Sequence, residues 1–137
     1  MKRQRIVAGN WKMNKEFDEG RDLAISIINK LGPTETKVVL CPPYIHLNYI
    51  STLTKGIANL HTGAQNCHNE ESGAYTGEIS VSMIRSAGCE YVIIGHSERR
   101  EYFSESNEQL AAKVNAALAA GLKPIFCCGE KLDVREA

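Results

Sequence analysis

Short apolar runs alternate along the chain with longer segments in which apolar residues recur at helical spacing. The runs are rich in β-branched residues and lack polar alternation, which is typical of parallel strands that are covered on both faces. We therefore predict five strands, at residues 5–8, 37–41, 57–60, 91–94 and 124–127.

Four segments between these strands have the features of helices, namely apolar residues at helical spacing, a polar residue that caps the start, or a glycine that ends the helix. These segments are residues 17–31, 44–53, 80–88 and 106–121. In the last of them Ser106 and Gln109 have the spacing of a capping box. The stripe expected to be buried there consists of Leu110, Val114, Ala117 and Leu118.

The repeated strand–helix unit predicts an α/β fold with a parallel sheet and right-handed crossovers. No shift in composition marks a linker, so residues 1–137 are expected to form a single domain. Two closures fit the pattern: an open, doubly wound sheet, or part of a (β/α)8 barrel. The pattern does not decide between them.

The composition of the chain argues against several classes of protein. Lys and Arg together number 16, as do Asp and Glu, and 43% of the residues are hydrophobic. A balanced charge argues against a nucleic-acid or anionic-membrane partner, and no apolar run approaches the about 18 residues needed to span a bilayer. The five cysteines lack a CxxC spacing, which favours reduced thiols in a cytoplasmic protein.

Polar clusters are expected just after the strand ends, where α/β proteins place their sites. They are residues 10–14, 63–66, 95–100 and 129–131. Together they contain a cation, amides, a histidine and several carboxylates, a set that suits a small anionic substrate with an oxygen to be polarised. The chain has neither a G-x-G-x-x-G motif nor a P-loop, and Cys67, His68 and His61 lack the spacing of metal ligands.

His96 is the most informative single residue. It follows Gly95 at the end of a buried strand, and Ser97 and Glu98 look like the opening of a short helix. The positive end of that helix disfavours imidazolium, which would leave a neutral ring able to donate a hydrogen bond to a developing oxyanion. A purely structural histidine is the alternative at this point.

Lys12 lies beyond the first strand and would supply a fixed cation for a phosphate, with Asn10 holding its ammonium. The alternative is an ordinary solvated lysine. Residues 66–79 form a long, polar, glycine-containing connection. Loops of this length are usually functional or disordered, so this one is either a segment that reaches a partner subunit or a mobile surface loop.

Taken together, these clusters resemble the triosephosphate isomerase family. The resemblance covers essentially the whole chain and rests on the following segments: Gly9-Asn10-Trp11-Lys12-Met13-Asn14, residues 63–66, residues 73–80, Ile94-Gly95-His96-Ser97-Glu98-Arg99-Arg100, and residues 127–137. Cys128 departs from the aliphatic residue usual in the family. The resemblance implies a (β/α)8 barrel, here its first five strands and four helices.

The resemblance also implies an activity and its residues. The family interconverts dihydroxyacetone phosphate and glyceraldehyde 3-phosphate through an enediolate, without cofactor or metal. Lys12 would stabilise negative charge, and His96 would be the neutral electrophile. The family is itself a known case of such a histidine, so this does not test the argument above independently. Asn10 would contribute to substrate binding, with Ser97, Glu98 and a buried Cys127 in support.

The same resemblance implies a homodimer in the cytoplasm. Residues 73–80 would interdigitate with a partner subunit, placing Thr76 near the partner's active site and pairing Glu78 with Arg99 across the interface. Asn14 and Gln65 would lie at that interface too. Lys12 and His96 are expected on neighbouring strand ends.

A complete barrel needs about 250 residues, and this sequence accounts for five of its eight strands. The catalytic glutamate, the substrate lid and the glycine-rich phosphate site have no counterpart among these residues. We therefore expect the 137-residue chain alone to be inactive and prone to aggregation. Three interpretations remain: the amino-terminal part of an isomerase, one half of a split enzyme, or a non-catalytic half-barrel that acts in binding or assembly.

Overall fold

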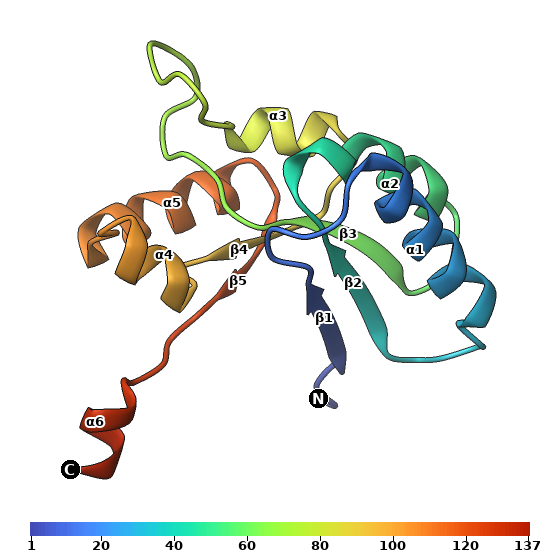
Figure 1. Cartoon of the computed structure of the whole chain (residues 1–137), viewed down its shortest axis with the longest axis horizontal. Coiled ribbons are helices and arrows are strands. Elements are labelled where there is room, and N and C mark those ends of the chain that lie inside the picture. Colours follow the sequence, from blue (N-terminus) through green and yellow to red (C-terminus); the bar gives the residue numbers. More distant parts are fainter.

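The computed structural model of the chain describes residues 1–137 and alternates strands with helices along the sequence (Figure 1). The elements are β1 (Ile6–Asn10), α1 (Phe17–Lys30), β2 (Lys37–Cys41), the short 3-10 helix η1 (Tyr44–His46), α2 (Leu47–Thr54), β3 (Leu60–Ala64), α3 (Val81–Ser86), β4 (Tyr91–Ile94), α4 (Ser97–Tyr102), α5 (Asn107–Ala119), β5 (Lys123–Phe126) and α6 (Leu132–Glu136).

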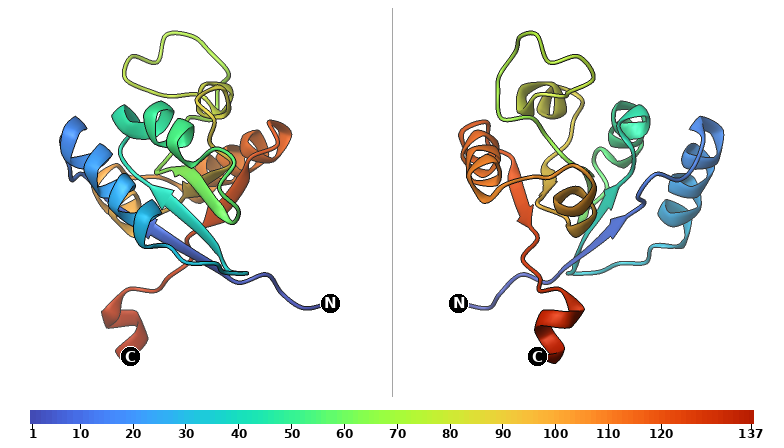
Figure 2. Two further views of the ribbon diagram at one scale, coloured as in Figure 1. Left: turned by 90° about the vertical axis from the view of Figure 1, so that its right-hand side faces the viewer. Right: turned by 60° about the vertical axis from the view of Figure 1, so that its left-hand side comes forward.

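The five strands form one parallel sheet in the sequential order β1-β2-β3-β4-β5. The sheet is curled, and the longer helices pack around its convex side (Figures 1 and 2). A doubly wound sheet would reverse its strand order and carry helices on both faces. The sequential order and the one-sided helices therefore confirm an α/β fold in the form of a partial (β/α)8 barrel.

Apolar residues are buried on both faces of the sheet. On the convex face, one cluster joins β3 and β4 to α3 and α5, with Ile84, Val92, Ile94 and Leu110 at its centre. A second cluster on that face packs Ala24 of α1 and Ile50 of α2 against β2 and β3. On the concave face, the alternate residues Val39, Cys41, Tyr91 and Ile93 form a third cluster. Side chains therefore fill the inside of the curl as well.

The third strand differs from its predicted position. It was expected at residues 57–60, but β3 begins at Leu60 and runs to Ala64. Gly56 and Asn59 both have positive φ, and the amide of Asn59 binds the carbonyl of Thr34 at 2.6 Å, so this stretch forms the turn after α2. Pairing with β2 starts only where Leu60 meets Val38.

Two further differences concern the helices. The stripe predicted for α5 is right at Leu110 and Ala117, which are fully buried, but Leu118 is 58% exposed. Lys113 takes its place at 2% exposure, because it lies three residues after Leu110 on the same face of the helix. The short helices α4 and α6 also add to the four predicted helices. No helix is both long and apolar enough to cross a lipid bilayer.

Candidate functional site

Lys12 is held by hydrogen bonds to its backbone just after β1. Its N–H donates to Oδ1 of Asn10 at 2.9 Å, and its carbonyl accepts from Nε2 of Gln65 at 2.8 Å. The same Gln65 nitrogen donates to the carbonyl of Cys41 at 2.9 Å, which ties the turn to the end of β2. Lys12 has a φ of 56°, a region that side chains other than glycine rarely adopt. These contacts hold that conformation.

Asn10 was expected to hold the ammonium of Lys12, and the structure shows a different contact. Its side chain binds the backbone N–H of Lys12 and not the ammonium, because the turn after β1 folds back over the asparagine. The ammonium lies 2.8 Å from Oε1 of Glu98, on α4.

The contact between Lys12 and Glu98 shifts both groups toward their charged forms. The hydrogen bond and the charge of Glu98 raise the pKa of Lys12, with burial opposing the shift. The hydrogen bond from Lys12 lowers the pKa of Glu98, again against burial, and the charge of Lys12 adds to the effect. Both side chains are partly exposed, at 56% and 41%, so the ammonium remains open to a ligand from solvent.

His96 leaves the sheet through a sharp turn. Gly95 directly before it has a φ of 78°, and His96 is the N-cap of α4. Its Nδ1 accepts the N–H of Glu98 at 3.1 Å and lies 3.6 Å from the Oε2 of the same residue. A ring nitrogen that accepts a hydrogen bond carries no proton, so this contact fits a neutral ring protonated on Nε2.

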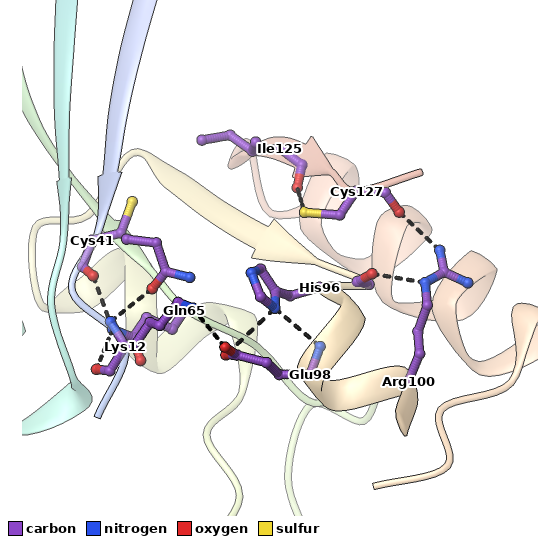
Figure 3. Close-up of polar contacts among 10 residues, drawn as sticks. Lys12, Cys41, Gln65, His96, Glu98, Arg100, Ile125 and Cys127 are labelled. Carbon is purple, nitrogen blue, oxygen red and sulfur yellow. Dashed lines mark hydrogen bonds and ion pairs between the residues drawn. The ribbon is translucent and has the colours of Figure 1, made fainter. Parts of the chain in front are cut away.

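Lys12 and His96 meet although their strands are not neighbours. β2 and β3 lie between β1 and β4, so the expectation of neighbouring strand ends is wrong. The curl of the sheet brings the two ends together across its concave side, and Glu98 contacts both residues (Figure 3).

Cys127 is less buried than expected. β5 ends at Phe126, so Cys127 lies after the strand and is half-buried, while Cys128 is exposed. Nothing in the chain pairs with β5 except β4, which leaves this end open. Burial still raises the pKa of the Cys127 thiol.

The remaining predicted residues lie around this site or outside it. Ser97 is exposed at the first position of α4 and makes no side-chain hydrogen bond in this chain, so its support of the network stays a prediction. Asn14 is exposed and binds the carbonyl of Trp11 at 2.8 Å. Thr76 and Glu78 lie in the exposed loop between β3 and α3, which projects from the body of the chain (Figures 1 and 2).

A buried polar network behind α4 was missed entirely. Glu105 contacts Nζ of Lys113 and lies 3.3 Å from Nε of Arg99, and Lys113 also donates to Oδ1 of Asn66 at 3.0 Å. The hydroxyl of Tyr44 donates to the carbonyl of Asn66 at 2.5 Å. Because charged residues are rarely buried, a sequence pattern assigns Lys113 to the surface. Only the helical spacing from Leu110 could have indicated otherwise.

The arrangement combines an exposed ammonium with a hydrogen-bonding imidazole at one edge of the sheet. Such a pair can bind an anion and stabilise negative charge that develops on a nearby oxygen. No group of three or more His, Cys, Asp or Glu side chains is arranged to hold a metal ion. A surface hollow lies between α2 and the start of β3, near His61 and Glu90, away from Lys12 and His96.

Sequence comparisons relate the chain to known proteins. A family model described as triosephosphate isomerase matches residues 5–137. Among curated proteins, the triosephosphate isomerase of Cytophaga hutchinsonii is 52% identical over 138 residues, which cover 98% of this chain and 54% of that protein. Those of Alkaliphilus oremlandii and Bacteroides fragilis are each 51% identical, over 98% of this chain and 54% of their own length. The chain thus spans about half the length of these relatives.

Proposed function

The chain belongs to the triosephosphate isomerase family, and from this premise we propose that it is the amino-terminal part of an enzyme that interconverts dihydroxyacetone phosphate and D-glyceraldehyde 3-phosphate. This aldose–ketose isomerisation is a step of glycolysis and gluconeogenesis. A proton leaves one carbon and is returned to its neighbour, so negative charge develops on the oxygens of an enediolate. The observation that carries the proposal is the shared contact of Lys12 and His96 with Glu98.

In this proposal Lys12 binds the triose phosphate and stabilises its negative charge. The pKa of Lys12 is raised from an ordinary value of 10.5 that already lies well above neutral pH, so the side chain is cationic there. A fixed cation at the developing enediolate lowers the barrier because it need not reorganise during the reaction. Asn10 and Gln65 hold the backbone of Lys12, so they position the ammonium through the turn.

His96 is the second catalytic residue of the proposal. Its Nδ1 is occupied by the N–H of Glu98, so Nε2 carries the proton that is donated to a substrate oxygen. A neutral imidazole that gives its Nε2 proton to one enediolate oxygen becomes an imidazolate. It then takes a proton back from the neighbouring oxygen, so the ring is neutral again at the end. Glu98 supports both residues, and Cys127, whose carbonyl accepts a hydrogen bond from Arg100, follows β5.

The proton-abstracting base is assigned to a part of the protein outside residues 1–137. Glu98 is the carboxylate that contacts Lys12 and His96, and it is committed to the ion pair. A general base contributes about 10²–10⁴-fold in rate. We therefore expect no useful turnover from these 137 residues alone.

The proposal includes a homodimer in the cytoplasm, formed with the loop between β3 and α3. Residues 70–78 of this loop are exposed, and the Tyr75 ring lies 4.4 Å from the His68 ring between centroids, tilted by 36°. Thr76 would approach the site of the partner subunit, and Glu78 would pair with Arg99 across the interface. Asn14 would lie at the same interface, together with Gln65.

The test is an isomerase assay on the full-length protein with both triose phosphates. Turnover is expected for the wild type, and His96→Gln should lower kcat by about 100-fold or more. His61→Gln is the matched control, because His61 binds Glu90 at 2.9 Å away from Lys12 and should leave kcat unchanged. Absence of wild-type turnover would contradict the proposal and favour a binding or assembly module. An unchanged kcat in His96→Gln would remove His96 from the mechanism.

A further inference from the structure

The guanidinium of Arg100 joins the ends of two neighbouring strands beside the candidate site (Figure 3). Its Nε donates to the carbonyl of Gly95 at 2.7 Å, and its Nη2 donates to the carbonyl of Cys127 at 2.9 Å. Gly95 directly follows β4, and Cys127 directly follows β5. The third nitrogen, Nη1, donates to Oδ1 of Asn107 at the start of α5, at 3.1 Å.

The two strand-end carbonyls lie just beyond the last rung of the backbone ladder. That rung is the hydrogen bond from the N–H of Cys127 to the carbonyl of Ile94 at 2.9 Å, and no backbone N–H donates to the carbonyl of Gly95 or of Cys127. A guanidinium holds its donors in one plane at fixed directions. Arg100 thus continues the connection between β4 and β5 by one step, with a side chain in place of backbone.

The hydrogen bond from Arg100 to the carbonyl of Gly95 also constrains the backbone of His96, because the two residues share a peptide group. The carbonyl of Gly95 and the nitrogen of His96 belong to one rigid plane, so holding the oxygen fixes the orientation at which His96 begins. Contact at this turn is close. Gly95 has a φ of 78°, and a Cβ at this position would lie 3.0 Å from Nη2 of Arg100. His96 then starts α4, the helix that carries Arg100 itself.

We propose that Arg100 is a positioning residue for His96, whose forked contact with Gly95 and Cys127 locks the β4–α4 turn and thereby the direction of the imidazole. This inference rests on the proposed function, in which His96 donates a hydrogen bond to the substrate. A displacement of a reacting group by about 1 Å can lower a rate about 100-fold, so a modest loosening of this turn has a large kinetic effect.

The chain offers a matched control for a purely structural effect. Arg85 on α3 also uses its guanidinium to bind a backbone carbonyl, donating from Nη1 to Ala120 at 2.6 Å at the end of α5. That contact joins the end of α3 to the residue directly after α5, and it involves neither Gly95 nor His96. Loss of this contact at Arg85 should therefore affect stability without touching the site.

The experiment compares Arg100→Lys, Arg100→Ala and Arg85→Lys in the full-length protein. Lysine keeps the charge but lacks the planar fork. Arg100→Lys is expected to lower kcat by about 10- to 100-fold with little change in KM, because it disturbs the orientation of His96 more than the binding of phosphate. Guanidinium ion added to Arg100→Ala should restore part of kcat. NMR of the imidazole nitrogens should show His96 protonated on Nε2 in the wild type and altered in Arg100→Lys, with Arg85→Lys unchanged in both measurements.

Several results would overturn the inference. One is a kcat of Arg100→Lys equal to that of the wild type, and another is an equal loss in Arg85→Lys, which would indicate a general effect of destabilisation. If the wild type itself shows no isomerase activity, the proposed function fails, and the NMR comparison still decides the inference. Identical His96 signals in the wild type and Arg100→Lys would then reject it.

Discussion

The ammonium of Lys12 lies 2.8 Å from Oε1 of Glu98, so the end of β1 is linked directly to α4 across the concave side of the sheet. Two strands, β2 and β3, separate these elements in the sheet order. A contact of this kind depends on curvature, since the two ends of a flat sheet would lie too far apart. It is also the contact that brings the cation into the same site as His96.

Replacing Glu98 by Gln should lower the pKa of Lys12 toward its ordinary value of 10.5, because the hydrogen bond and the charge that raise it are lost. In the wild type the pair should persist over a wide pH range. It is lost on the acid side as pH falls through the pKa of Glu98, which lies below 4.5, and on the alkaline side as pH rises through the pKa of Lys12, which lies above 10.5. Titration of the Lys12 side chain by NMR measures both limits.

Glu101→Gln provides the control for this measurement. Glu101 lies on the same helix α4 and is exposed, but it forms no ion pair. The Lys12 titration should not change in this variant. If it moved as far as in Glu98→Gln, the shift would reflect the net charge of the helix and not the direct contact.

Gly95→Ala should impair both stability and turnover of the full-length protein. A side chain at positive φ costs about 1–2 kcal/mol. The new Cβ would also press against Nη2 of Arg100 at 3.0 Å and Cδ1 of Leu110 at 3.3 Å. Denaturant unfolding and steady-state kinetics together check the expectation of a lower free energy of unfolding and a lower kcat.

Gly56→Ala separates the two effects. Gly56 has a φ of 81°, close to that of Gly95, but a Cβ there would meet nothing within 4 Å. This variant should lose a similar backbone contribution to stability and keep its kcat. If Gly95→Ala kept the kcat of the wild type, Arg100 would have shifted to make room for the new Cβ without moving His96.

Much of the fold follows from local patterns in the sequence. Adjacent residues suffice to predict the apolar runs of β2 and β4. They also suffice for the caps of α3 and α5, where Ser80 and Ser106 accept the expected backbone hydrogen bonds. β3 was misplaced because its residues His61, Thr62 and Gly63 have little apolar character, and its start is set by pairing with β2. Pairing is a long-range property that periodicity along one segment does not contain.

The sequence predicts that Lys12 and His96 lie at strand ends, but it does not predict the hydrogen bonds that connect them to the rest of the chain. Strand ends point to Lys12 and His96 because a parallel sheet collects its carboxyl ends at one edge. The sequence does not reveal that Gln65 holds the carbonyl of Lys12, 53 positions away, or that Arg100 bridges to Cys127. Such contacts depend on the curl of the sheet and on the rotamers of long side chains.

Replacing Lys113 by Met should destabilise the protein strongly. Lys113 is 2% exposed and contacts both Glu105 and Asn66, so its removal leaves a buried carboxylate with Arg99 as its remaining cation. Breaking a buried ion pair from one side costs about 3–5 kcal/mol. Denaturant unfolding of the full-length protein measures this loss.

The matched comparison is Arg21→Met on α1. Arg21 also pairs with carboxylates, Asp18 and Asp22, but these side chains are 77% and 67% exposed. Exposed pairs contribute about 0–1 kcal/mol, so this variant should stay near the wild type. Equal losses in the two variants would mean that the burial of Lys113 carries no special energetic weight.

Thiol modification should follow burial in the folded protein. Burial raises the pKa of Cys41 and of Cys89 to about 12 and that of Cys67 to about 11, so these thiols hold little thiolate at mildly alkaline pH. Cys128 is exposed and should react first with iodoacetamide, followed by the half-buried Cys127. Timed labelling followed by peptide mass spectrometry gives the order. Labelling of Cys41 as fast as Cys128 under native conditions would contradict it.

The 137-residue chain produced alone should associate or unfold without a sharp transition. β1 pairs only with β2 and β5 only with β4, so each outer strand presents an unpaired edge that can add further strands. Apolar side chains lie open on those strands: Val7 is 61% exposed and Phe126 is 48% exposed. Light scattering should detect association, and calorimetry should show a broad transition. A monomer with a sharp, reversible two-state melt would demonstrate that the clusters on the two faces of this curled sheet suffice to hold it.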